Sequence, residues 1–151
     1  MLYVTPLTYF WAEEGVDVNQ ADMKALMDTI SRILFAIPLV VFGLFHLTKA
    51  GMLAGAVPIP GGVFWVYLTG LAFLAASVAI LIKKYASLAT LLLGIMLLVF
   101  VLLVQLPGTL KGGDSAMMHF PNLLKDTALA GAAFFMSGIF KKEEEEKTVS
   151  G

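Results

Sequence analysis

The segment HFPNLLKDTALAGAAFFMSGIF, residues 119–140, is apolar enough to cross a membrane yet carries charged side chains inside its own span. Because proline is favoured at the first helical position, we expect the helix to begin at Pro121. Lys125 can extend its long stem to the membrane surface, whereas the short side chain of Asp126 cannot. An unpaired carboxylate in hydrocarbon costs about 3 kcal/mol, so Asp126 is predicted to face inward and to have a partner.

The composition indicates an integral membrane protein. The 151 residues are 59% hydrophobic and only 14% charged, with a mean hydropathy of +0.88, which is more apolar surface than a soluble domain of this size can bury. A net charge of −1 provides no basic field, so we expect no nucleic-acid partner. The chain contains no cysteine, which excludes disulfides, thiolate metal sites and cysteine nucleophiles, and no other metal-binding signature is present.

Four apolar segments predict an all-α fold, namely an integral membrane four-helix bundle. The spans are expected at about residues 30–47, 63–82, 86–106 and 121–140. Pro38 is expected to kink the first span, and Pro107 with Gly108 is expected to end the third. Residues 50–62, AGMLAGAVPIPGG, are too few to span a membrane and too apolar for water, so we expect a loop that lies in the interface or dips into the bundle.

The two ends of the chain are more polar than its middle. Residues 1–27 form an N-terminal extension, in which apolar residues at three- and four-residue steps after Asn19 predict a short amphipathic helix on the membrane surface. A flexible extension is the alternative. Residues 141–151, KKEEEEKTVSG, are a charge run that predicts a solvated, disordered tail.

Four spans place both ends of the chain on one side of the membrane. The side with both termini carries Lys24, Arg32, Lys83, Lys84, Lys141, Lys142 and Lys147, and the other side carries Lys49, Lys111 and Lys125. Because basic residues are retained on the cytoplasmic side, we expect both termini in the cytoplasm and the protein in the inner (plasma) membrane.

Five ionisable residues are expected near the outer ends of the first and fourth spans, at a similar depth. They are His46, Lys49, His119, Lys125 and Asp126. One interpretation is a polar outer pocket in which two imidazoles take up protons, ligate a metal or haem, or hold a quinone carbonyl. The other is that histidines at helix ends simply meet headgroups and water.

Asp126 allows two interpretations as well. Adjacent helix positions point about 100° apart, so Lys125 is not expected to face it, and the candidate partners are His46, Lys49 and Gln105. As a structural latch, Asp126 fixes how the fourth helix docks; as a functional group, it is a buried acid suited to proton transfer. Close helix packing is predicted at small residues, namely Gly43, Gly70, Gly131 and Gly138.

Several stretches resemble the DoxX family of small bacterial and archaeal four-helix membrane proteins. They are RILFAIPLVVFGLFHL, PGGVFWVYLTGLAFLAASVAILI, KKYASLATLLLGIMLLVF and HFPNLLKDTALAGAAFF, which together cover about residues 28–140. The most telling residues are Gly43 with His46, the Tyr67 to Gly70 entry to the second helix, and Asn122, Lys125, Asp126 and Gly131 in the fourth.

The resemblance implies a small subunit or quinone-proximal component of a membrane redox system, with a redox partner protein and a bound quinone. Founding members of the family are described as the membrane subunit of a thiosulfate:quinone oxidoreductase. Two departures argue against that activity: residues 71–76 lack the acidic residue that many relatives carry after the glycine matching Gly70, and a chain without cysteine cannot carry sulfur as a persulfide. The alternative is a non-enzymatic scaffold or assembly factor that packs against a partner's helices or forms a homo-oligomer.

Overall fold

The computed structural model describes residues 19–57 and 60–150, and every regular element in these ranges is helical. The elements are α1 (Gln20–Thr48), α2 (Ala50–Leu53), the 3-10 helix η2 (Ala54–Ala56), α3 (Gly62–Ile82), α4 (Ala86–Phe100), the π-helical segment η3 (Val101–Gln105), α5 (Leu106–Leu110) and α6 (Gly113–Ser150). Residues 1–18 of the predicted extension, residues 58–59 of the predicted loop and residue 151 lie outside the described part.

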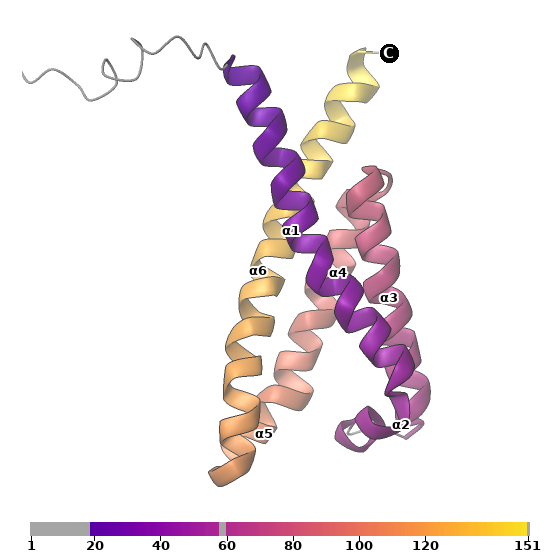
Figure 1. The fold of residues 1–151 in the computed structure, drawn as a ribbon, viewed down its shortest axis with the longest axis vertical. Helices are drawn as coiled ribbons and strands as arrows, with labels where there is room; N and C mark the ends of the chain where they lie inside the picture. The colour runs from indigo at the N-terminus through magenta and orange to yellow at the C-terminus, as the bar shows by residue number, and fades with distance from the viewer. Residues whose placement is uncertain (1–18, 58–59, 151) are drawn as a thin grey trace, which may run out of the picture.

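Four helical stretches are long and apolar enough to cross a membrane. They are Gln20–Thr48, Gly62–Ile82, Ala86–Leu110 and Gly113–Val149, and each contains one of the spans predicted from the sequence. The all-α fold with four membrane-capable helices is therefore confirmed. The beginning of α1 and the end of α6 lie at the same end of the molecule, beside the turn between α3 and α4 (Figure 1). We call this the termini end, and we call the opposite end, where α2 and α5 lie, the distal end.

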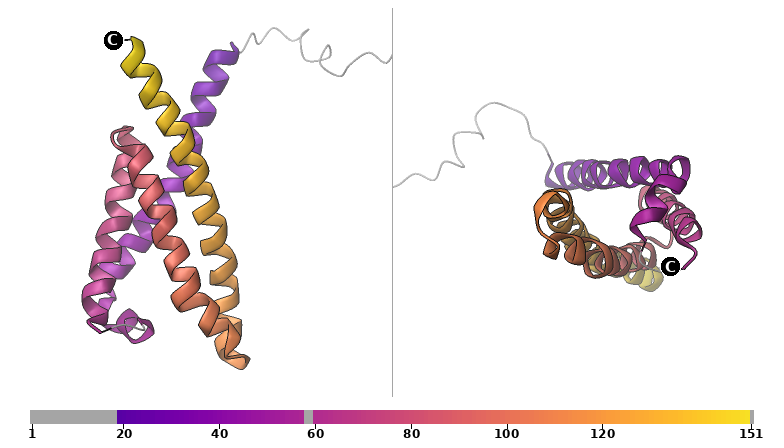
Figure 2. Two further views of the ribbon diagram at one scale, coloured as in Figure 1. Left: turned by 180° about the vertical axis from the view of Figure 1, so that it is seen from behind. Right: turned by 90° about the horizontal axis from the view of Figure 1, so that it is seen from below.

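The helices pack as two pairs. α1 packs along α3, α4 packs along α6, and α3 joins the pairs through its shorter contact with α4. Figure 2 shows the α4–α6 pair from behind, and in the view from below α1 lies along one side of the molecule. The core is formed by Leu39, Phe73, Ala76, Ile80, Ala86, Leu93, Leu97, Ala130, Ala133 and Phe140. Large apolar side chains outside this core stay exposed, which suits helices surrounded by lipid.

The predicted amphipathic segment after Asn19 belongs to α1 itself. The Asn19 side chain caps the helix by accepting a hydrogen bond from the backbone N–H of Ala21 at 3.2 Å. From Gln20 the helix runs without a break to Thr48 and continues through Pro38. Residues 20–27 are therefore the first turns of the first long helix rather than a separate surface helix.

α1 and α3 cross most closely where two glycines meet. A Cβ added to Gly43 would lie 2.8 Å from Leu74 Cγ and 3.0 Å from the backbone oxygen of Gly70, and one added to Gly70 would lie 3.0 Å from the oxygen of Gly43. Side chains at these positions would push the helices apart. Gly131 and Gly138 differ, because a Cβ added to either would meet nothing within 4 Å, so the packing predicted for them is not found among the described residues.

α6 is longer at both ends than the sequence suggested. It begins at Gly113 rather than at Pro121, which lies inside the helix, and it runs to Ser150 through the segment predicted to be a disordered tail. The tail is held at the turn between α3 and α4, where Glu143 lies 3.3 Å from Lys83 Nζ and Glu144 accepts from the backbone N–H of Ser87 at 3.5 Å. These two contacts give the charge run a fixed partner, which corrects the prediction of disorder.

The third membrane-capable stretch also differs from its predicted end. Helical structure passes through Pro107 and Gly108 and stops at Leu110. Pro107 lies at the first or second position of α5, where its missing N–H is tolerated, and the π-helical turns of η3 precede it. Residues 50–56, predicted as an apolar loop, form α2 and η2, and these pack against the beginning of α3.

Candidate functional site

The main polar site of the apolar region is centred on Gln105, at the end of η3. Its amide nitrogen donates to Asp126 Oδ2 at 3.0 Å, and its amide oxygen lies 2.9 Å from Nδ1 of His119. Because the amide oxygen can only accept, Nδ1 of His119 carries the proton in this contact, and Nε2 of the neutral ring is an acceptor. We call His119, Gln105, Asp126, Lys125 and Asn122 the polar chain.

Asp126 is the most buried charged residue of the polar chain, with 7% of its surface exposed. Besides Gln105, it has Lys125, whose Nζ lies 3.4 Å from Asp126 Oδ1 and also donates to Asn122 Oδ1 at 3.1 Å. The prediction that Lys125 and Asp126 do not face each other is corrected here. Their Cβ directions diverge, but the long lysine stem bends back and brings the ammonium to the carboxylate.

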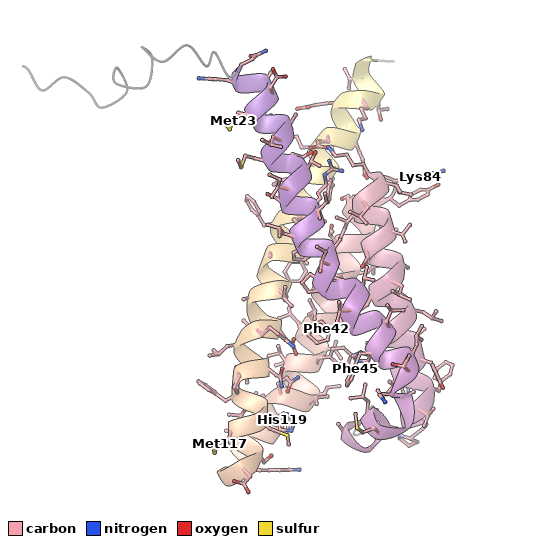
Figure 3. All side chains as sticks on the ribbon, in the orientation of Figure 1. Met23, Phe42, Phe45, Lys84, Met117 and His119 are labelled. Carbon is pink, nitrogen blue, oxygen red and sulfur yellow. The ribbon has the colours of Figure 1, made fainter. Side chains whose placement is uncertain are left out.

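Phe42 brings α1 to the polar chain. The Lys125 ammonium lies 4.2 Å from the centroid of the Phe42 ring, a cation–π distance between α6 and α1. In Figure 3, Phe42 lies on the distal half of α1, and His119 lies still nearer the distal end. Phe42 was not identified from the sequence; its position four residues before His46, on the same helix face, was the available signal.

His46 and Lys49 are not part of the polar chain. Nδ1 of His46 lies 2.7 Å from the backbone oxygen of Phe42, one turn earlier, and the ring meets Phe73 edge-on at 5.5 Å between centroids. Lys49 caps the end of α1 through its backbone N–H, which donates to Phe45. Of the five candidate residues, the structure therefore joins His119, Lys125 and Asp126 and leaves the two from the first span apart.

Gly108 makes room for the His119 ring. A Cβ added to Gly108 would lie 2.3 Å from both Cγ and Cδ2 of His119, so no larger residue fits without moving the imidazole. Because Gly108 follows Pro107, the sequence suggested a helix end, and its contact with His119 was not predicted.

The π-helical segment η3 is a second feature of the site. π-Helical turns occur often at functional sites, and this one ends on Gln105.

The polar chain is suited to holding and moving a proton or to binding a carbonyl oxygen. A His119 ring protonated at Nε2 would donate there while Nδ1 stayed on Gln105, and the buried carboxylate of Asp126 would stabilise the positive charge through the amide. A metal is not indicated: no cluster of three or more histidine, aspartate or glutamate side chains able to hold one occurs within residues 19–57 and 60–150.

A second polar group, the ionic clamp, lies at the termini end. Lys83 Nζ lies 2.7 Å from Asp28 Oδ2 and 3.3 Å from Glu143 Oε2, and Asp28 also pairs with Arg32 at 3.2 Å. The sequence predicted the Asp28–Arg32 pair from its four-residue spacing. Lys83 and Glu143 were not foreseen, because they come from the turn after α3 and from the distant end of α6.

No family model, curated protein or solved structure matches the chain. The polar chain and the membrane-capable helices are therefore the features that point to a function.

Proposed function

We propose that this chain is a DoxX-like protein of the plasma membrane that acts as a small, quinone-proximal component of a membrane redox system. The observation that supports it is the bridge from His119 through Gln105 to the buried carboxylate of Asp126. A titratable imidazole linked to a buried acid within membrane-capable helices is the kind of group that proton-coupled chemistry in membranes uses.

In this proposal the polar chain supplies protons and orientation rather than electrons. A quinone, when bound, would supply the redox chemistry, with its electrons coming from a partner redox protein. When the ring carries a proton on both nitrogens, His119 donates from Nε2 to a carbonyl oxygen in the bilayer while Nδ1 stays bonded to Gln105. Asp126 holds the Gln105 amide in place, and the Lys125 ammonium beside it limits the net negative charge of the site.

The test is quinone binding to the protein in lipid nanodiscs, measured by calorimetric titration with decylubiquinone. Wild type should bind, and His119→Ala should weaken binding at least tenfold. His46→Gln is the matched control, since the His46 ring bonds to Phe42 and packs on Phe73 outside the polar chain, and it should leave binding unchanged. Equal binding by wild type and His119→Ala, or no binding by either, contradicts the proposal.

A second candidate, a non-enzymatic scaffold, is favoured by one observation. Within the described residues, no buried side-chain nitrogen or oxygen lacks a hydrogen-bond partner, so the buried polar atoms of the bundle need no ligand to be satisfied. In a scaffold, Asp126 acts as a latch between η3 and α6. Asp126→Asn would then lower the abundance and the unfolding temperature of the protein, while no quinone would copurify with the wild type.

We also propose that both termini lie in the cytoplasm. Support comes from the basic residues, which are more numerous at the termini end than at the distal end. The orientation can be tested by cysteine labelling, because the sequence contains no cysteine and an introduced one would be its single thiol. In intact cells, a membrane-impermeant maleimide should label Gly112→Cys and leave Ser150→Cys unlabelled, and the reverse pattern contradicts the orientation.

A further inference from the structure

The outward face of α3 is hollowed along its second half. The hollow is a shallow, open groove of about 500 Å³, lined by Leu71, Leu74, Ala75, Val78, Ala79 and Ile82 and bordered at the termini end by Lys84 and Tyr85. None of these residues belongs to the polar chain or to the ionic clamp. The groove is thus a separate feature on the side of the bundle that would face lipid.

The groove follows from the spacing of large and small residues. Its six apolar residues recur at steps of three and one, which places them on one helix face. Ala75 and Ala79, one turn apart, form the low floor between the larger side chains. From Leu71 to Ile82 the groove extends about 17 Å along the axis at 1.5 Å per residue. That is close to half of the roughly 30 Å hydrocarbon thickness, which is the depth of one leaflet.

The two neighbouring lysines after α3, Lys83 and Lys84, differ in whether acidic side chains pair with them. Lys83 lies between two carboxylates, those of Asp28 and Glu143, and is neutralised by them. Lys84 forms no ion pair within the described residues, and its Nζ lies 5.7 Å from the centroid of the neighbouring Tyr85 ring. Figure 3 shows Lys84 extending outward from the turn at the termini end. An uncompensated ammonium therefore lies at the mouth of an apolar groove.

We propose that this groove binds one acyl chain of an anionic phospholipid and that Lys84, with the hydroxyl of Tyr85, binds its phosphate. The groove matches the two parts of a phospholipid. Its apolar stretch from Leu71 to Ile82 suits an acyl chain, and the Lys84 ammonium at its end lies at the depth of the headgroup. The unpaired charge selects an anionic headgroup over a zwitterionic one. Exposed Tyr85, 71% accessible, supplies both an aromatic ring and a donor at the membrane interface.

The test is native mass spectrometry of the protein released from nanodiscs that contain equal amounts of phosphatidylglycerol and phosphatidylcholine. Wild type should retain phosphatidylglycerol preferentially, and Lys84→Gln should lower that preference about fivefold, the factor expected for one lysine at a membrane surface. Lys142→Gln removes a charge from the same end of the molecule but not from the groove, so its preference should match wild type.

A second variant examines the apolar part of the groove independently of the charge. Ala75→Leu fills the floor from the exposed side of α3 and should reduce retention of both lipids while the unfolding temperature stays near that of wild type. Equal retention of the two lipids by wild type would overturn the proposal. If Lys84→Gln and Lys142→Gln lowered the preference for phosphatidylglycerol equally, the proposal would also be overturned, because the preference would then not depend on the lysine at the groove.

Discussion

Gln105 donates its amide N–H to the Asp126 carboxylate across 3.0 Å, joining η3 to α6 inside the apolar region of the bundle. The same amide accepts from His119, so one uncharged side chain orients both titratable groups. Here a polar residue between two helices is satisfied by other polar side chains. Gln105 is for this reason the residue on which the polar chain depends.

Gln105→Leu should destabilise the bundle, because Asp126 loses its hydrogen-bond donor while staying buried. We expect the free energy of unfolding in detergent to fall by about 1–2 kcal/mol, the range for a hydrogen bond between membrane helices and to a charged group. Leu103→Ala, which changes an exposed side chain two residues earlier, serves as control and should have a smaller effect. An unchanged unfolding curve for Gln105→Leu would show that the contact does not stabilise the bundle.

Gly43→Leu should separate α1 from α3, because even the first side-chain carbon, Cβ, would lie only 2.8 Å from Leu74 Cγ. The expected loss is about 1–3 kcal/mol of unfolding free energy, as for overpacking elsewhere. Gly131→Leu is the matched control, since a Cβ at Gly131 meets open space. If the two variants unfold alike, the crossing of α1 and α3 is looser than described. Crosslinking of both variants shows in addition whether Gly131 contacts a second copy of the chain.

Gly108→Ala should move the His119 imidazole away from Gln105, because the new methyl group would overlap the ring. Nitrogen-15 chemical shifts of the histidine rings report which nitrogen carries the proton. We expect wild-type His119 to be protonated at Nδ1 when neutral and the variant to show a mixture of tautomers. Gly51→Ala, where an added Cβ meets nothing within 4 Å, should leave the His119 signals unchanged. Identical spectra for Gly108→Ala and wild type would contradict the described position of the ring.

Glu143→Gln should loosen the end of α6, because it removes one of the two acidic partners of Lys83 in the ionic clamp. These side chains are partly exposed, so the effect on stability should be only about 0.2–1 kcal/mol and should shrink at high salt. The informative measurement is amide hydrogen exchange of residues 143–149, which should become faster. Glu145→Gln serves as control, since no ion pair of Glu145 is seen in the described part of the chain. Equal exchange in both variants would mean that the clamp does not hold the helix.

The four membrane-capable helices could be predicted because their cause is local. A run of about twenty apolar residues has few alternatives to a helix in lipid, where every backbone N–H and C=O must be bonded within the segment. The Asp28–Arg32 pair is local in the same sense, since a four-residue spacing on one helix brings the two side chains together.

The ends of the helices were harder to predict, because they depend on contacts that the pattern does not contain. Proline and glycine after Leu106 suggested an end, yet η3 and α5 continue the helix. The charged run after Phe140 suggested disorder, yet Lys83 and Ser87 hold two of its glutamates. Helix propensity and charge are properties of an isolated segment. Contacts with distant parts of the chain can outweigh them in deciding where a helix ends.

By itself, then, the sequence determined the class of protein, the number of membrane-capable helices and the need for a partner to Asp126. Only the tertiary structure decided which residues meet: Gln105 reaches Asp126 over 21 positions, and Lys83 reaches Glu143 over 60. The reason is physical. Hydrophobic periodicity is a property of neighbouring residues, whereas the partner of a buried polar group is set by how distant helices pack and by the small residues that let them approach.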